Sequence, residues 1–215
     1  MNILLPKRTK LVIFDLDGTL YDKKGLPFRL VLSQLGHLSL LRSERKVRRE
    51  LAGRFFGSED AFYEAFFGRL SALCNCSAEV AQQWYETSYM PAMVRILKKH
   101  YRVRKGWQEM IGRLRDKGIR IAVLSDYGCV KEKLEALGFD LALADGIYSC
   151  PSIGALKPAV ETFLGVAARM NVQPEDCLAV GDREDTDGRG AFYAGIPCYI
   201  LGKKGKLYEY RNFSL

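Results

Sequence analysis

Histidine and closely spaced cysteine are scarce in this sequence. Only His37 and His100 occur among 215 residues, and no two of the six cysteines form a C-x-x-C pair. A zinc cluster needs His or Cys partners at spacings that this chain does not offer. We therefore interpret the cysteines as reduced and mostly buried thiols, at positions Cys74, Cys76, Cys129, Cys150, Cys177 and Cys198.

Long apolar runs are also missing. No window approaches the roughly 18 consecutive apolar residues of a membrane span, and the N-terminal sequence MNILLPKRTK has too short an apolar run for a secretory signal. The composition, 48% hydrophobic and 27% charged, is that of an ordinary globular protein with one domain or a domain with an insertion. These features predict a cytoplasmic protein without a membrane partner.

Acidic residues are sparse in one segment only. Residues 22–105 contain 16 Lys and Arg but 8 Asp and Glu, whereas the rest of the chain has 17 of each. The whole net charge of +8 therefore lies in this segment. A basic segment attracts anions such as a phosphorylated metabolite, a nucleotide or a nucleic acid backbone, although a solvated helical face is the commoner origin of such charge.

The stretch VIFDLDGTLYD, residues 12–22, is the most informative part of the chain. The apolar run Leu11–Phe14 predicts a buried strand, and Gly18 allows the tight turn that must end it. Asp15 and Asp17 thus lie at the carboxyl end of a buried strand, where open α/β sheets bind ligands. The bland alternative is a strand end capped by two solvated aspartates.

Two carboxylates one residue apart would repel each other unless a cation lay between them. Mg²⁺ is the usual cation for carboxylates together with phosphate oxygens. With the metal bound, Asp15 or Asp17 could act as a nucleophile and the other as a general acid and base.

Two further sites would suit phosphate chemistry. The strand Ile121–Leu124 runs into Ser125 and Asp126, where a hydroxyl and a backbone N–H can bind a phosphate oxygen. In GALKPAVETF, Lys157 precedes Pro158 at a predicted helix start, and a fixed ammonium there can neutralise a nucleophilic carboxylate and the transferred phosphoryl group. Each of these features alone would be unremarkable.

The last site is GDREDTDGRGAFYAG, residues 181–195. Asp182 ends a strand and could complete an oxygen-ligand Mg²⁺ site with Asp15 and a backbone carbonyl. Asp187 could orient those ligands or a metal-bound water. Glu184 and Asp185 lie in the same loop, and charge alone does not exclude them.

Elsewhere the periodicity separates a helical block from an alternating α/β region. Between about residues 26 and 101 no strand is predicted. In this block one helix start is suggested near Ser43 and another at Ser77. The aromatic stripe Phe55–Leu70 is interpreted as packing between helices in a core. Pro91 should break or kink a helix. After residue 105 the predicted strands are separated by helices, which predicts a parallel sheet. The predicted helices of this region are Trp107–Lys117, Val130–Leu137, Pro158–Met170 and Gly188–Ala194. The predicted strands are Ile119–Leu124, Cys177–Val180 and Ile196–Leu201, with a possible short strand at Ile147–Ser149. The tail Gly202–Leu215 has no assignment.

In this order, the four sites resemble those of the haloacid dehalogenase-like hydrolase superfamily, over residues 10–21 and about 105–201. The resemblance implies a Rossmann-like parallel-sheet α/β core, residues 1–21 and 106–215, with an all-helical cap inserted at residues 22–105. It also implies that Asp15 is the nucleophile and that Asp17 is the acid and base. Ser125, with Asp126 beside it, and Lys157 would bind the phosphoryl group, and Mg²⁺ would be held by Asp15, the Asp17 carbonyl, Asp182 and Asp187.

The function so implied is a Mg²⁺-dependent phosphatase of a small phosphorylated metabolite. Dehalogenases of this family lack a carboxylate at the position of Asp17, so this residue disfavours a dehalogenase. Thr19 stands where the family's mutases usually have Val, which disfavours a mutase. Arg183 departs from the family pattern, in which this position is often small and polar. A phosphomutase, a phosphonate hydrolase with a cap lysine, a nucleic-acid-end phosphatase and a non-catalytic binding protein remain alternatives, although nucleic acid is not the expected partner. The sequence fixes neither the substrate nor the oligomeric state; candidates for binding a second anionic group are Arg42, Arg45, Arg48, Arg49 and Arg54.

Overall fold

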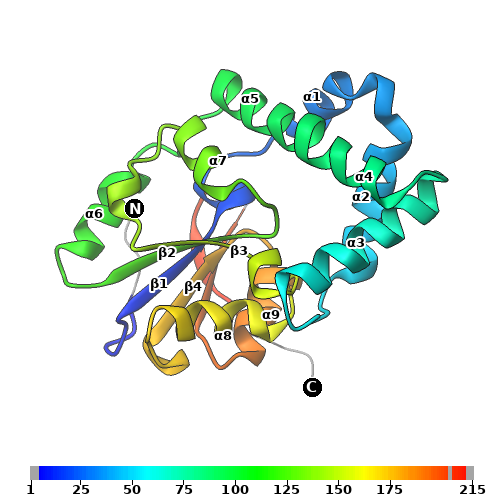
Figure 1. The fold of residues 1–215 in the computed structure, drawn as a ribbon. Helices are drawn as coiled ribbons and strands as arrows, with labels where there is room; N and C mark the ends of the chain where they lie inside the picture. Colours follow the sequence, from blue (N-terminus) through cyan, green and yellow to red (C-terminus); the bar gives the residue numbers. More distant parts are fainter. Residues whose placement is uncertain (1–4, 203–204, 212–215) are drawn as a thin grey trace.

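Six strands form one sheet in the computed structural model, which describes residues 5–202 and 205–211 (Figure 1). The spatial order is β3-β2-β1-β4-β5-β6. All neighbouring strands are parallel except β5 and β6. The strands are β1 (Leu11–Asp15), β2 (Arg120–Ser125), β3 (Gly146–Ser149), β4 (Cys177–Gly181), β5 (Cys198–Leu201) and β6 (Leu207–Glu209). Part of the MNILLPKRTK stretch and part of the unassigned tail lie outside the described residues.

Strand β1 is at the centre of the sheet. All five of its residues are buried, because β2 and β4 pair with its two edges and helices cover the sheet. In Figure 1, α7 lies above the sheet and α8 and α9 lie below it. The helices of this region are α6 (Trp107–Arg115), α7 (Val130–Ala136), α8 (Val160–Arg169) and α9 (Arg189–Tyr193). The predicted parallel α/β core is confirmed.

Between β1 and α6 the regular elements are all helices, and Phe55 forms an isolated bridge with Ala155. These helices arch over one end of the sheet in Figure 1. The aromatic stripe packs in their core, with Phe62 and Phe66 fully buried, but Phe55 is about half exposed. The helices are α1 (Leu26–Ser33), α2 (Leu38–Leu51), α3 (Glu59–Cys74), α4 (Ala78–Trp84) and α5 (Met90–His100).

The predicted helix starts and breaks agree with the structure at some positions and differ at others. The Ser77 hydroxyl accepts a hydrogen bond from the Val80 N–H, as predicted for an N-cap. No helix begins near Ser43, because α2 continues through it. Pro91 lies in the first turn of α5, directly after a π-helical turn over Tyr85–Tyr89. The regular α-helix is thus interrupted there, as predicted, although the chain stays helical. Pro158 precedes α8 instead of opening it.

All six cysteines are free thiols, in agreement with the prediction. Cys150, Cys177 and Cys198 are buried, whereas Cys129 is exposed. Within the described part of the chain, no helix combines the length and the apolar character needed to cross a membrane.

Candidate active site

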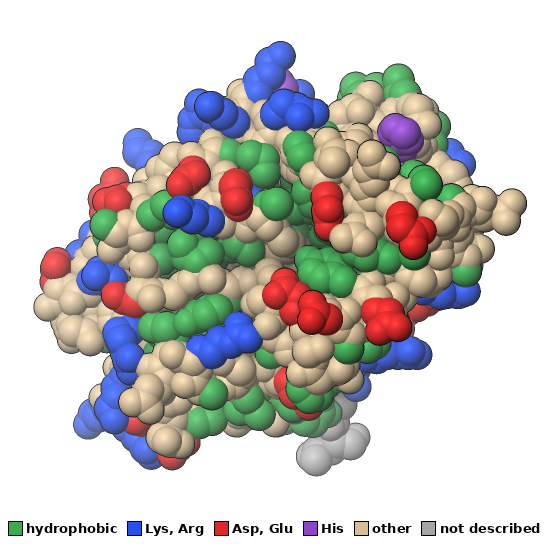
Figure 2. Space-filling model, in the orientation of Figure 1, with side chains coloured by type: hydrophobic (Ala, Val, Ile, Leu, Met, Phe, Trp, Pro, Cys, Tyr) green, Lys and Arg blue, Asp and Glu red, His purple; other side chains and the backbone are tan. Residues whose placement is uncertain are grey.

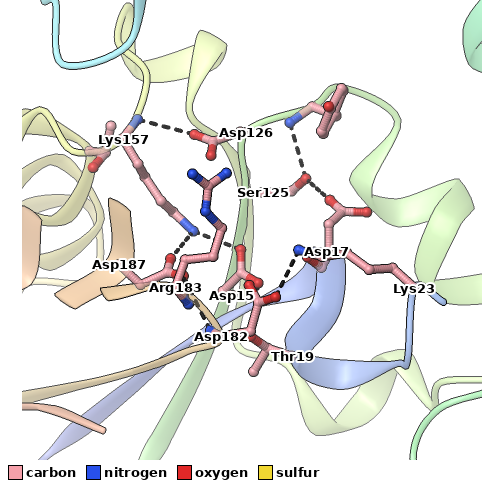
Figure 3. A network of polar contacts seen from close by, with 12 residues as sticks. Asp15, Asp17, Thr19, Lys23, Ser125, Asp126, Lys157, Asp182, Arg183 and Asp187 are labelled. Carbon is pink, nitrogen blue, oxygen red and sulfur yellow. Dashed lines mark hydrogen bonds and ion pairs between the residues drawn. The ribbon is translucent and has the colours of Figure 1, made fainter. Parts of the chain in front are cut away.

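The end of β1 and the turn that follows it present two aspartates in opposite directions. Asp15 points toward α8 and the loop after β4, whereas Asp17 points toward the end of β2 (Figure 3). Asp15 accepts hydrogen bonds from the Thr19 hydroxyl at 2.9 Å and from the Lys157 ammonium at 2.7 Å. The two carboxylates are thus held apart by different partners.

Gly18 is required at the turn for two reasons. Its φ of 114° is in the region that favours glycine, and a Cβ at this position would lie 2.2 Å from a carboxylate oxygen of Asp182. The Arg104 guanidinium fixes the same turn by donating to the carbonyls of Gly18 and Thr19, each at 2.9 Å. The turn therefore brings its backbone directly against the end of β4.

Lys157 lies almost completely buried between two carboxylates. Its Nζ is 2.7 Å from Asp15 Oδ1 and 2.7 Å from Asp187 Oδ1. Its backbone N–H donates to the Asp126 carboxylate at 3.1 Å. Asp126, which we expected beside the phosphate, thus holds the Lys157 backbone in place, and the neighbouring Tyr127 N–H donates to the Ser125 hydroxyl at 3.1 Å.

Asp15, Asp182 and Asp187 form an acidic cluster, in which one oxygen of each lies within 4.8 Å of the others. Hard oxygen donors at this separation suit Mg²⁺. The second oxygen of Asp187 accepts from the backbone N–H groups of Asp182 and Arg183. The structure also separates the loop's other acids from this cluster: Glu184 accepts from Tyr208, and Asp185 pairs with Arg183.

The Asp17 carboxylate does not belong to the acidic cluster. It accepts hydrogen bonds from Tyr21 at 2.8 Å, from Ser125 at 2.6 Å and from Lys133 at 2.5 Å. Its backbone carbonyl instead lies on the side of Asp182: the Lys23 ammonium is 2.7 Å from that carbonyl and 2.7 Å from Asp182 Oδ2. Of Asp17, only the backbone carbonyl is therefore placed on the side of the acidic cluster.

Sequence reasoning missed Lys23 and Lys133. Lys133 is 0% exposed and lies on the buried side of α7 with Val130 and Leu134. Its spacing of three from Val130 and four from Leu137 places it on their face of the helix and is a signal that could have found it, since lysine is almost never fully buried without a partner. Nothing in the polar stretch around Lys23 distinguishes it from Lys24.

The surroundings set the charges of the two aspartates differently. Burial raises the pKa of Asp15 to about 6, although the Lys157 ammonium opposes this shift. Burial would also raise the pKa of Asp17, but Lys133 and the hydrogen bonds to its carboxylate hold it below the ordinary value. Burial raises the pKa of Asp182 and of Asp187. A bound divalent cation would relieve the burial of these carboxylates.

The raised pKa of Asp15 predicts an unusual pH dependence of stability without metal. Between the unfolded value near 3.8 and the folded value of about 6, the folded state binds more protons, so stability should fall as pH rises through this window. In chelator, we expect Asp15 to make the free energy of unfolding about 1 kcal/mol larger at pH 5 than at pH 7. Urea titrations of wild type and Asp15→Asn at both pH values measure this difference in the free energy of unfolding. A difference in wild type no larger than that in the variant would contradict the prediction.

A cavity of about 940 Å³ extends from the acidic cluster to the helices above the sheet. Its floor includes Asp15, Asp17, Lys157 and Asp182, and α1, α2 and α5 contribute to its walls. Of the five arginines proposed for a second anionic group, this cavity is lined by Arg45, Arg48 and Arg49 and not by Arg42 or Arg54. The volume exceeds what a phosphate alone would fill.

Comparison with known proteins agrees with this geometry. The model of the haloacid dehalogenase-like hydrolase family matches residues 9–195. The chain belongs to this family. It is similar to phosphoglycolate phosphatase of Nitrosospira multiformis, with 29% identity over 91% of this chain and 84% of that protein. It is also 38% identical to glyceraldehyde 3-phosphate phosphatase of Methanopyrus kandleri, over 39% of this chain and 36% of that protein.

Among solved structures, 2-haloacid dehalogenase from Pseudomonas syringae pv. Tomato DC3000 superposes with a TM-score of 0.63 at 21% identity, over 96% of this chain and 91% of that one. This similarity shows the shared fold alone. Because the family model covers most of the chain, the protein is a hydrolase of the haloacid dehalogenase-like type, and both curated relatives named above are phosphatases.

Proposed function

We propose that the protein is a Mg²⁺-dependent phosphatase that acts on a small phosphorylated metabolite through an aspartyl-phosphate. The observation that carries this proposal is the buried Lys157 ammonium, placed 2.7 Å from Asp15 in a cluster with Asp182 and Asp187. Such a site can neutralise a phosphoryl group at the moment of its transfer. The relatives named for phosphoglycolate and glyceraldehyde 3-phosphate support a small substrate.

In the proposed reaction, a carboxylate oxygen of Asp15 attacks phosphorus in line with the ester oxygen, whose bond to phosphorus breaks. Asp17 protonates the leaving oxygen and later takes a proton from the water that hydrolyses the aspartyl-phosphate. Lys133 keeps Asp17 ionised in the resting protein, so the proton that Asp17 passes to the leaving oxygen must first be taken up from the phosphate monoanion of the substrate or from solvent. The ionised form suits the later water-activating step. Ser125 and Lys157 bind the phosphoryl oxygens. Mg²⁺, held by Asp15, Asp182, Asp187 and the Asp17 carbonyl, would neutralise phosphate charge.

Hydrolysis of an aryl phosphate with Mg²⁺ and with chelator tests this proposal. We expect turnover that requires the divalent cation. A folded protein that hydrolyses neither an aryl phosphate nor any of a panel of phosphorylated metabolites, and that binds no beryllium fluoride at Asp15, would contradict it.

Lys23 should compete with the divalent cation. Its ammonium contacts both the Asp17 carbonyl and Asp182, two of the proposed ligands. Removing this positive charge in Lys23→Met should tighten Mg²⁺ binding about three- to tenfold, because the metal no longer displaces an ammonium. Calorimetric titration of Mg²⁺ into the substrate-free protein measures this directly. Lys24→Met is the matched control and should bind like wild type; weaker binding by Lys23→Met would instead make Lys23 a supporting residue of the site.

The alternatives receive less support. On the face drawn in Figure 2, acidic and basic side chains are interspersed and form no single basic stripe of the kind that tracks a nucleic acid backbone. Among the lysines of residues 22–105, only Lys23 lines the cavity, so it is the one candidate for a Schiff base in phosphonate hydrolysis. We further propose that residues 22–105 act as a cap that closes over residues 1–21 and 106–215 and excludes water, and that the protein is cytoplasmic.

A further inference from the structure

Two arginines in the cavity wall form no ion pair with a carboxylate in the described part of the chain. Arg45 and Arg49 lie four residues apart on α2, so they project from the same side of the helix. Both are exposed and both line the cavity that contains Asp15 and Lys157. Within residues 5–202 and 205–211, no carboxylate forms an ion pair with either guanidinium; Arg49 Nε donates only to the Arg45 carbonyl, at 3.3 Å.

The other arginines of the cavity are already engaged. Arg48 donates to Glu44, to the Tyr85 hydroxyl and to the Asp126 carbonyl, and it stacks 4.1 Å from the Tyr127 ring. Arg183 pairs with Asp185, and Arg189 lies 6.0 Å from the Tyr193 ring. Arg48 thus fastens α2 to the loop after β2, which fixes the stripe that carries Arg45 and Arg49 above the site.

Charge is segregated within the cavity. Its acidic residues belong to the loops at the end of the sheet, where the proposed metal and Lys157 compensate them. The α2 wall contributes only cations, and the wall formed by Leu26, Pro27 and Leu30 of α1 is apolar. A ligand that places its phosphate at Asp15 therefore extends between a cationic wall and an apolar wall. Guanidinium groups bind carboxylates and phosphates through paired hydrogen bonds.

We propose that Arg45 and Arg49 bind a second anionic group of the substrate, so that the enzyme selects phosphate esters that also carry a carboxylate or a second phosphate. The inference rests on the proposed function and adds the class of substrate. Because the second group is bound alike before and during phosphoryl transfer, its loss should raise KM more than it lowers kcat.

The test uses substrates that differ in one group. 3-Phosphoglycerate and glycerol 3-phosphate differ by a carboxylate in place of a hydroxymethyl, and fructose 1,6-bisphosphate and fructose 6-phosphate differ by a phosphate. We expect wild-type kcat/KM to be at least about tenfold higher for the more anionic member of one pair, which also identifies the group. The double variant Arg45→Ala/Arg49→Ala should lose that preference through KM and should hydrolyse an aryl phosphate within about threefold of wild type.

The double variant Arg42→Ala/Arg54→Ala is the matched control. It removes the same charge from exposed positions outside the cavity and should retain the preference. Equal wild-type activity on both members of both pairs, or an equal loss on charged and neutral substrates in Arg45→Ala/Arg49→Ala, would overturn the inference. If wild type hydrolyses no phosphate ester, the proposed function fails instead. Calorimetric binding of the same four compounds to wild type and to both double variants then decides the role of the arginines: a lost preference in Arg45→Ala/Arg49→Ala alone supports it, and no preference in wild type overturns it.

Discussion

Replacing Asp15 by Asn should reduce phosphatase turnover by at least about a thousandfold, because an amide cannot form the acyl-phosphate. The substitution keeps the size of the side chain, and the amide oxygen can still accept from Thr19 or Lys157, which now contact the carboxylate at 2.9 and 2.7 Å. Steady-state hydrolysis of an aryl phosphate measures the loss.

Asp185→Asn is the control for this experiment. Asp185 also lines the cavity, but it pairs with Arg183 and lies outside the acidic cluster. We expect its turnover to remain within about threefold of wild type. Substantial turnover by Asp15→Asn would show that another group carries the phosphoryl transfer, with Asp182 as the first to test.

Lys157→Met should damage both stability and activity. The ammonium is buried between Asp15 and Asp187, and its removal leaves two buried carboxylates without their counter-charge. Breaking a buried ion pair from one side costs about 3–5 kcal/mol, and the loss of the phosphate-binding cation should lower kcat/KM by at least about a thousandfold. Urea unfolding in chelator gives the first quantity and aryl phosphate hydrolysis the second.

Addition of Mg²⁺ should recover part of the lost stability, because the metal supplies positive charge to the same carboxylates. Lys10→Met provides the comparison. Lys10 pairs with Asp176 at 2.6 Å, but its side chain is 68% exposed, so its replacement should cost less than about 1 kcal/mol. An equal loss in the free energy of unfolding in Lys157→Met and Lys10→Met would mean that the buried contacts of Lys157 stabilise the protein no more than an exposed ion pair does.

Asp15, Asp17, Lys157 and Asp182 could be proposed from the sequence, and their order along the chain, which resembles that of the family, is what set the later ones apart. Each occurs next to an apolar run or a glycine that predicts a strand end or a turn, and the carboxyl ends of parallel strands converge at one edge of a sheet. The same reasoning predicted the parallel core. Helix limits were less certain, as at Ser43 and Pro158, because capping and tertiary contacts decide where a helix begins.

The tertiary structure alone decided which charges meet. Nothing in the sequence distinguishes Glu184, Asp185 and Asp187, three acidic residues of one loop. Of these, only Asp187 points inward and contacts Lys157. Lys133 reaches Asp17 from a helix 116 residues away in sequence, and Arg45 faces the cavity while Arg42, one turn earlier, does not line it. Local sequence determines strands and turns because these depend on neighbouring residues; the partner of a charged side chain depends on how distant elements pack.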